Sequence, residues 1–244
     1  MKQKKCLGII GGLGPMASAQ FMTLLTAMTD ADSDRKHPEV LLYSRPDTPD
    51  RTAFLLGESN ESPLPSMLHA GKTLEQMGAQ VLAIPCMTAY GFYEQLRESL
   101  QAELIHPIQE TASLLRQHGI RSAGIMATDG SLKAKVYQQA LKKQGITAVL
   151  PDAKRQQMVM RIIYEQVKAG KPANLQTLGA VRRHLTQQGA EIVLLGCTEL
   201  SVVKQTQHIG GGYLDVMEVL AASALQACGY PVRENLYNAM VWPL

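Results

Sequence analysis

The chain has few cysteines and no charge excess. Four cysteines, Cys6, Cys86, Cys197 and Cys228, are spread over 244 residues without a Cys-x-x-Cys pair. This spacing argues against a disulfide framework and predicts a reduced, cytoplasmic setting. The six histidines lack the close spacing of a zinc site, so no metal is expected. The formal charge of +3 comes from 24 basic and 21 acidic residues, well mixed along the chain, which predicts no nucleic-acid partner. No apolar run approaches the roughly 20 residues of a membrane span, so no membrane partner is expected.

Short apolar runs alternate with helical patterns along the chain. Buried strands are predicted at residues 6–10, 39–44, 80–85, 103–107, 122–127, 147–151 and 191–196. Helices are predicted at residues 16–31, 65–78, 87–100, 130–145, 152–170, 174–189 and 216–229. This alternation predicts parallel sheets with helices on both faces.

The sequence contains an internal duplication. "QMGAQVLAIPCMTAY", which begins at residue 76, and "QQGAEIVLLGCTEL", which begins at residue 187, align without a gap, so Cys86 and Cys197 hold equivalent places. The repeat is too long for a solenoid unit and predicts two similar, doubly wound α/β domains. The crossing point is expected near residues 106–107.

The two matched cysteines follow predicted strands and open the next helix. Ligands of open parallel sheets bind beyond the carboxyl ends of the strands, and a helix N-terminus stabilises a thiolate. The alternative is a small buried residue, which is the preferred interpretation for Cys6 and Cys228. Two thiols at matched sites suit a reaction that needs an acid and a base on opposite faces of one carbon, as racemisation does.

A glycine-rich turn follows the first predicted strand. "GLGPMA", residues 12–17, fits the G-x-G-x-x-A pattern of dinucleotide-binding turns. However, Pro15 removes a backbone donor, and no acidic residue ends the second strand. A tight turn whose N–H groups meet a substrate carboxylate is therefore favoured, with NAD binding as the alternative.

Two cations and a second turn are further candidates. Arg51, in "PDTPDRT", follows the second strand and could bind a carboxylate through two donors, or be a solvated loop arginine. Lys168 ends the predicted helix "IIYEQVKAG", where a cation is favourable in any case. The turn "ATDGS", residues 127–131, could be an anion site or an ordinary helix cap.

Six segments together resemble the aspartate/glutamate racemase family, over about residues 6 to 228. They are "GIIGGLGPMAS", "PDRT", "MATDGS", "IIYEQVKAG", "GCTEL" and "YLDVM". The resemblance implies two pseudo-symmetric domains, 1–106 plus 215–244 and 107–214, with the active site in the cleft between them. It also implies an amino-acid substrate, catalysis by Cys86 and Cys197 without a cofactor, and a homodimer. Glu199 resembles the aspartate branch and favours aspartate over glutamate.

The first cysteine motif departs from the family pattern. The family reads Cys-Asn-Thr-(Ala/Met)-His where this chain has Met87 and Tyr90. The substrate side chain is therefore open, and so are a hydantoin racemase or maleate isomerase activity and a small-carboxylate-binding role. The candidate substrate-binding residues are Leu13, Arg51, Met87, Thr88, Lys168, Thr198 and Glu199. Trp242 is expected to be a packed residue of the C-terminal tail.

Overall fold

The fold is taken from a computed structural model, which describes residues 4–234. Trp242, expected to pack in the tail, lies outside the described residues. Within them, the strands form two four-stranded parallel sheets. The first contains β1 (Leu7–Gly11), β2 (Val40–Ser44), β3 (Val81–Ala83) and β4 (Glu103–Leu104). The second contains β5 (Ser122–Met126), β6 (Thr147–Val149), β7 (Ile192–Leu195) and β8 (Tyr213–Asp215).

The two sheets have the same topology. Their orders are β2-β1-β3-β4 and β6-β5-β7-β8, so each strand of the first has a counterpart four strands later. The central strands β1, β3 and β7 are buried along their whole length, as expected of parallel strands covered on both faces. The predicted α/β fold with two similar parallel sheets is confirmed.

Helices cover both sheets. Those before β5 are α1 (Pro15–Met28), α2 (Arg51–Leu56), α3 (Leu64–Gln76), α4 (Tyr93–Ser99) and α5 (Pro107–Gln117), with the 3₁₀ turns η1 (Asp34–Lys36) and η2 (Met87–Phe92). Those after it are α6 (Asp129–Lys133), α7 (Val136–Lys143), α8 (Ala153–Arg161), α9 (Leu175–Gln187), α10 (Thr198–Thr206) and α11 (Val216–Ala227), with the π-helical segment η3 (Ile162–Val167). No helix of the described part is long and apolar enough to cross a membrane.

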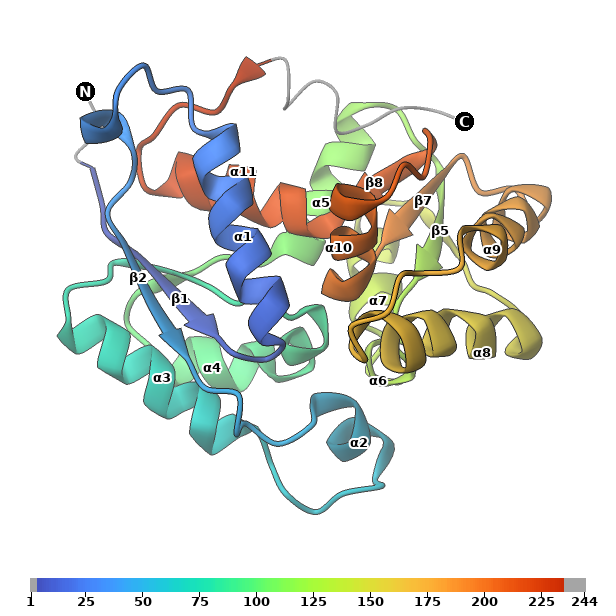
Figure 1. The fold of residues 1–244 in the computed structure, drawn as a ribbon, viewed down its shortest axis with the longest axis horizontal. Helices are drawn as coiled ribbons and strands as arrows, with labels where there is room; N and C mark the ends of the chain where they lie inside the picture. The colour runs from blue at the N-terminus through green and yellow to red at the C-terminus, as the bar shows by residue number, and fades with distance from the viewer. Residues whose placement is uncertain (1–3, 235–244) are drawn as a thin grey trace.

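The last helix returns to the first half of the molecule. Figure 1 shows β1 and β2 at the left and β5, β7 and β8 at the right, with the red helix α11 lying beside α1 and α5. The predicted division assigns α5 and α11 to different domains, yet they pack on each other and share one hydrophobic cluster. A second cluster lies under α8, α9 and α10. The domain boundaries at residues 107 and 215 stay a prediction.

Every strand predicted from the sequence is present, but the helices differ in detail. The helix predicted over residues 130–145 is divided into α6 and α7, because Lys135 adopts a left-handed conformation with φ of 57°. The helix predicted over residues 87–100 begins as η2, and the one over residues 152–170 widens into η3. Helices α2 and α5 and the short strand β8 were not predicted as elements.

Candidate active site

Cys86 and Cys197 line one cavity. Cys86 follows β3 and precedes η2, and Cys197 follows β7 and precedes α10. β3 and β7 hold equivalent places in their sheets. The carboxyl ends of these two strands therefore both lie at this space. Both residues have extended backbones and are 6% exposed. The cavity is narrow, with a volume of about 10 Å³.

The inner cavity adjoins an outer pocket of about 350 Å³, with which it shares lining residues. The inner cavity is lined by Leu13, Asp50, Arg51, Thr52, Cys86, Met87, Thr88, Thr128, Tyr164, Lys168, Cys197, Thr198 and Glu199. The outer pocket is lined by residues 12–17 and by Pro46, Thr48, Asp50, Arg51, Val167, Lys168, Glu199 and Val202. Five residues line both spaces and are called the neck here: Leu13, Asp50, Arg51, Lys168 and Glu199. All charged residues of the inner cavity therefore belong to the neck.

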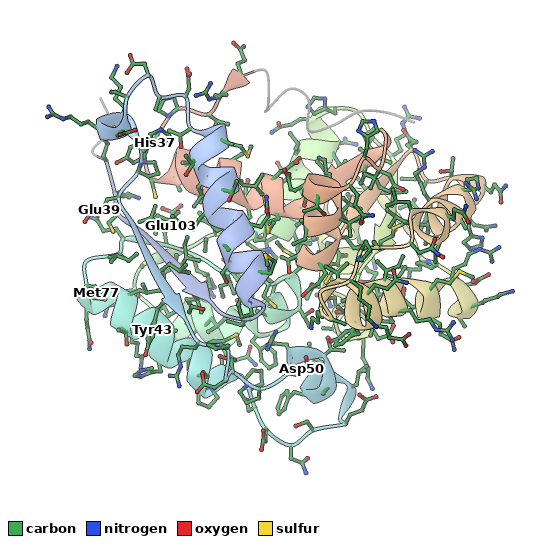
Figure 2. The ribbon with its side chains drawn as sticks, in the orientation of Figure 1. His37, Glu39, Tyr43, Asp50, Met77 and Glu103 are labelled. Carbon is green, nitrogen blue, oxygen red and sulfur yellow. The ribbon has the colours of Figure 1, made fainter. Side chains whose placement is uncertain are left out.

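Arg51 begins α2 and is held rigidly. Asp50 caps the helix by accepting the Ala53 N–H at 2.9 Å, and Figure 2 labels Asp50 at this end of α2. The guanidinium Nη1 donates to the carbonyls of Thr48 (3.2 Å) and Pro49 (3.0 Å), and Nη2 donates to that of Leu13 (2.6 Å). Arg51 is 7% exposed, so the alternative of a solvated loop arginine is wrong.

The buried Arg51 guanidinium faces the first thiol. Burial by itself lowers the pKa of Arg51, but its interactions with the Cys86 sulfur and, to a lesser extent, Asp50 more than offset this and raise the pKa. Arg51 Nε is buried without a hydrogen-bond partner. A cation thus lies beside Cys86 with donor capacity left over.

Lys168 is presented by the wide turn η3. Its ammonium lies 4.0 Å from the centre of the Tyr164 ring, four residues earlier, and 3.9 Å from Asp50 Oδ2. Burial lowers the pKa of Lys168, but the Glu199 carboxylate and then Tyr164, Cys197 and Asp50 outweigh it, so the pKa is raised. Lys168 therefore stays charged, and its ion pair with Asp50 links the second half of the chain to the first.

The second thiol faces a carboxylate. Cys197 Sγ donates to Glu199 Oε2 at 2.8 Å, and Thr198 Oγ1 donates to the same oxygen at 3.2 Å. Burial, followed by the charge and hydrogen bond of Glu199, raises the pKa of Cys197 well above its usual value. Glu199 is only 6% exposed. Cys197 is therefore a protonated thiol at neutral pH.

Hydroxyl groups join the two halves under the cavity. Thr88 Oγ1 lies 2.9 Å from Thr128 Oγ1, and the Ser131 hydroxyl donates to Thr88 at 3.2 Å. Thr128 Oγ1 also accepts the Ser131 N–H, so the turn at residues 127–131 is an ordinary helix cap. A Cβ on Gly130 would lie 2.8 Å from Thr52 Cα, which explains glycine where α6 meets α2.

The glycine-rich turn supports the neck. Gly12 has φ of 86°, and a Cβ there would lie 2.3 Å from the Arg45 nitrogen, so only glycine fits. Its N–H donates to Ser18 Oγ at 2.9 Å and is not free for a substrate. The turn instead supplies the Leu13 carbonyl, which accepts from Arg51. The Gly12 N–H is therefore not among the turn N–H groups that could meet a substrate carboxylate, and for the other N–H groups of the turn the expectation stays a prediction.

A buried tyrosine hydroxyl braces each cysteine turn from behind. Tyr137 Oη donates to the Gly196 carbonyl at 2.9 Å, and Tyr90 Oη accepts the Ile84 N–H at 3.4 Å. Tyr90 does not line the inner cavity; its ring packs near Tyr93 and His106. Tyr90, which stands where the resembled family has histidine, thus supports the fold of the Cys86 turn and does not line the cavity.

All sequence-predicted site residues line the inner cavity: Leu13, Arg51, Met87, Thr88, Lys168, Thr198, Glu199 and the two cysteines. Sequence reasoning missed Asp50, Thr52 and Tyr164 as lining residues. Two of them had a local signal, because Asp50 precedes Arg51 and Tyr164 lies one helical turn before Lys168. Among residues 4–234, no three His, Cys, Asp or Glu side chains gather as metal ligands would.

The arrangement suits proton transfer at a carbon acid. One sulfur lies beside a cation and the other donates to a carboxylate, and the raised pKa of Cys197 keeps that thiol in the proton-donating form. Arg51 and Lys168 can hold a carboxylate and stabilise negative charge that develops next to it. A reacting carbon between the sulfurs would meet a base and an acid.

The chain is similar to known proteins in sequence and in fold. The family model described as "Asp/Glu/Hydantoin racemase" matches residues 10–224. The broad specificity amino-acid racemase RacX of Bacillus subtilis is 26% identical over 203 residues, covering 81% of this chain and 86% of that protein.

Solved structures share the fold. The aspartate racemase of Picrophilus torridus superposes with a TM-score of 0.82 and 28% identity, covering 97% of this chain and 100% of that one. The glutamate racemase of Francisella tularensis, solved with D-glutamate, has a TM-score of 0.64 and 15% identity, covering 92% and 80%. At that identity, the second comparison supports the fold only.

Proposed function

The chain belongs to the Asp/Glu/hydantoin racemase family, and on this premise we propose that it interconverts the enantiomers of an α-amino acid through Cys86 and Cys197. The enzyme class, an isomerase that acts on amino acids, follows from the family. The two-thiol assignment is the proposal. One observation carries it: the equivalent ends of two equivalent strands each present a buried cysteine to the same cavity.

The proposed step moves two protons. The Cys86 thiolate takes the α-proton from one face of the substrate, and the C–H electron pair spreads into the α-carboxylate. The Cys197 S–H then gives its proton to the opposite face of the same carbon. Cys86 ends as a thiol and Cys197 as a thiolate, and the reverse reaction or proton exchange with water restores the starting state.

The surroundings of the two sulfurs differ. Arg51 interacts with the Cys86 sulfur, whereas the carboxylate of Glu199 accepts the Cys197 proton in a hydrogen bond. Glu199 and burial raise the pKa of Cys197, which keeps it a proton donor over the neutral range. In this direction we therefore assign the acid to Cys197 and the base to Cys86.

The negative charge of the intermediate needs stabilisation. An α-proton beside a carboxylate is weakly acidic, and preorganised cations are an effective means of lowering that barrier. Arg51 keeps an unpartnered Nε donor, and Lys168 lies at the neck. We assign the α-carboxylate to these two groups, with the hydroxyls of Thr88 and Thr198 as further ligands.

The amino acid on which the enzyme acts is a separate proposal. Aspartate is the prediction from the sequence, and one similar structure is named an aspartate racemase while the curated relative is named for broad specificity. The homodimer and the division into domains at residues 107 and 215 likewise stay predictions.

The test is α-proton exchange in D₂O, followed by proton NMR and chiral chromatography on a panel of L- and D-amino acids. Cys86→Ser and Cys197→Ser should each lower racemisation by about 10²–10⁴-fold, the usual contribution of a general acid or base. Each variant should still exchange the α-proton of one enantiomer without inversion, and the two variants should favour opposite enantiomers.

Cys6→Ser is the matched control, because Cys6 precedes β1 at the end of the sheet away from the cavity. It should keep wild-type racemisation. Substantial racemisation by either site variant would refute the two-thiol mechanism. Inactivity toward every amino acid, with exchange of a 5-substituted hydantoin, would move the chain to the hydantoin branch of the family.

A further inference from the structure

A separate pocket, called the rear pocket here, lies behind the Cys86 turn at the junction of the two halves. Its volume is about 160 Å³, and it shares no lining residue with the inner cavity or the outer pocket. One wall comes from η2, α4 and the start of α5. The other comes from the end of α6 and from α7, which packs on α5 (Figure 1). The volume is below the roughly 300–1,000 Å³ of pockets for drug-sized ligands, so the rear pocket suits a small molecule.

The floor of the rear pocket is aromatic and uncharged. Tyr90 is 3% exposed, and the centre of its ring lies 5.3 Å from that of His106. The Tyr93 ring meets the same imidazole edge to face, with 4.3 Å between the ring centres. Burial lowers the pKa of His106 to about 4, so this imidazole is neutral at pH 7. Its Nδ1 accepts the Gln109 N–H at 3.2 Å, which places the remaining ring proton on Nε2 and makes Nε2 a donor.

The rim of the rear pocket carries opposite charges on opposite walls. Glu94 on α4 and Lys143 in the last turn of α7 both line the pocket and are exposed. Glu94 raises the pKa of His106 and Lys143 lowers it, so both charges act on the imidazole between them. Within residues 4–234 no ion pair joins Lys143 to Glu94, which pairs through Oε2 with Arg97 at 3.1 Å. A separated cation and anion above a neutral floor complement a molecule that carries both charges.

The floor of the rear pocket also holds the strand end that carries Cys86. Tyr90 Oη accepts the Ile84 N–H at 3.4 Å, and the Ile84 carbonyl accepts the Cys86 N–H at 2.7 Å. Tyr90 itself belongs to η2, the turn that begins directly after Cys86. A molecule packed on the Tyr90 ring therefore restrains the backbone on both sides of Cys86.

We propose that the rear pocket binds a free α-amino acid, which acts as an effector of the Cys86 turn. The carboxylate of this amino acid meets Lys143 and the Nε2–H of His106, and its ammonium meets Oε1 of Glu94. A compact side chain rests on the tyrosine rings. This site goes beyond the proposed racemase reaction, because none of its residues lines the space between the two cysteines.

The probe is 2-aminoisobutyrate, a compact zwitterion that has no α-proton and cannot be racemised. Amide chemical shifts of the isotope-labelled full chain are followed by NMR as the probe is added. We expect saturable shifts at Gly91, Gln95 and Gln139, which line the rear pocket. Isobutyrate lacks the ammonium and isopropylamine lacks the carboxylate. Each should bind about fivefold more weakly or worse, because each loses one charged contact at an exposed rim.

Four variants test the assigned contacts. Lys143→Gln and Glu94→Gln should each weaken binding of the probe by about three- to tenfold, as for the loss of one exposed charged partner. Lys142→Gln and Glu98→Gln are the matched controls. They change exposed neighbours on the same two helices that do not line the rear pocket, so they should bind the probe like the wild type.

The effect on the Cys86 turn is measured by hydrogen exchange of the Ile84 N–H. Saturation with the probe should slow this exchange about fivefold or more, the lower end of the coupling between two sites. Tyr90→Phe removes the acceptor of this N–H and should abolish the slowing. The exchange is read without turnover, so it does not depend on the proposed reaction.

Each part of the proposal has an outcome that would overturn it. Shifts confined to residues that line the inner cavity would assign the zwitterion to the active site alone. Equal affinity in Lys143→Gln and Lys142→Gln would overturn the assigned carboxylate contact. Unchanged exchange of the Ile84 N–H at saturation would overturn the effector role. A failure of the racemase proposal would leave all three measurements valid.

Discussion

The two cysteine turns share a backbone and differ in charge. Cys86 and Cys197 end equivalent strands, have extended backbones and are equally buried. Yet Cys86 lies beside the Arg51 guanidinium, whereas Cys197 donates to the Glu199 carboxylate. Duplication supplied the symmetric geometry that a two-faced proton transfer needs. Opposite charges therefore face two sulfurs that hold equivalent places in the fold.

The turns are also built from different parts of the chain. Arg51 reaches Cys86 from α2, a six-residue helix between β2 and α3, whereas the equivalent connection of the second half holds the longer α8 and η3. Glu199 lies two residues after Cys197 on the same helix. The cation is therefore a tertiary feature, and the carboxylate is a local one. Substitution of Arg51 and substitution of Glu199 should therefore affect catalysis differently.

The largest effect is expected at the cation of the first turn. Arg51→Lys keeps the charge but loses the fork that donates to the carbonyls of Leu13, Thr48 and Pro49. We expect kcat/KM to fall about 100-fold or more, as when one preorganised donor is removed from an anion site. Steady-state racemisation measures this. Lys168→Arg, at the more exposed cation, should lose less; equal losses would mean that the two cations are interchangeable.

The next effect is expected at the carboxylate of the second turn. Glu199→Gln removes the charge that raises the pKa of Cys197 in addition to burial. As the acid, Cys197 must be protonated, so the rate falls as pH rises through its pKa, and the variant should show this fall at lower pH. We expect kcat/KM near neutrality to drop about tenfold, because a hydrogen bond to a charged acceptor is replaced by one to a neutral acceptor.

Thr198→Val is the control for this change. It removes the other hydrogen bond to the Glu199 carboxylate but keeps the charge. In a pH–rate profile, the rate of Thr198→Val should fall at nearly the same alkaline pH as the rate of the wild type. If the alkaline fall in rate shifts equally in Glu199→Gln and Thr198→Val, then hydrogen bonding around the carboxylate, and not its charge, sets the acidity of Cys197.

The same comparison explains what the sequence could predict. The strands, the matched cysteines and Glu199 follow from local pattern and from the repeat, because each lies within a continuous run of residues. Helix α2 is only six residues long, and Arg51 there becomes buried only because the Leu13 turn folds over it. Likewise Tyr137, 59 residues before its partner Gly196, gives no signal in the sequence. Contacts between distant segments set the charge and bracing of the turns, and short-range patterns do not encode them.

The braces behind the turns should differ in strength. Tyr137→Phe leaves the Gly196 carbonyl without its donor at 2.9 Å, whereas Tyr90→Phe removes an acceptor at 3.4 Å. We expect Tyr137→Phe to lower the free energy of unfolding by about 1–3 kcal/mol, the cost of a buried unsatisfied group, and Tyr90→Phe to lower it less. Urea denaturation compares them. A larger effect of Tyr90→Phe would mean that the Cys86 turn depends more on its brace.

The smallest net effect is expected in the pH dependence of stability, because groups behind the two turns act with opposite sign and partly cancel. Burial lowers the pKa of His106, which caps α5 near Tyr90, to about 4 from 6.5. Burial raises the pKa of Asp215, which accepts from Ser201 on α10, to about 7 from 3.8. Between pH 4 and 6.5 the unfolded chain binds the extra proton of His106, so stability falls as pH is lowered. Between pH 3.8 and 7 the folded chain holds the extra proton of Asp215, so stability falls as pH is raised.

Two variants that keep a helix-cap acceptor separate these two opposing pH dependences of the free energy of unfolding. His106→Asn offers an amide oxygen in place of the ring Nδ1 that accepts the Gln109 N–H, and Asp215→Asn keeps the oxygen that accepts the Met217 N–H. In urea denaturation across pH 4 to 7, His106→Asn should lose less stability on acidification than the wild type, and Asp215→Asn should lose less on the way to neutral pH. The double variant should show the flattest profile. If both single variants shift the profile in the same direction, the groups behind the two turns do not oppose each other, and the asymmetry is confined to the residues that face the cavity.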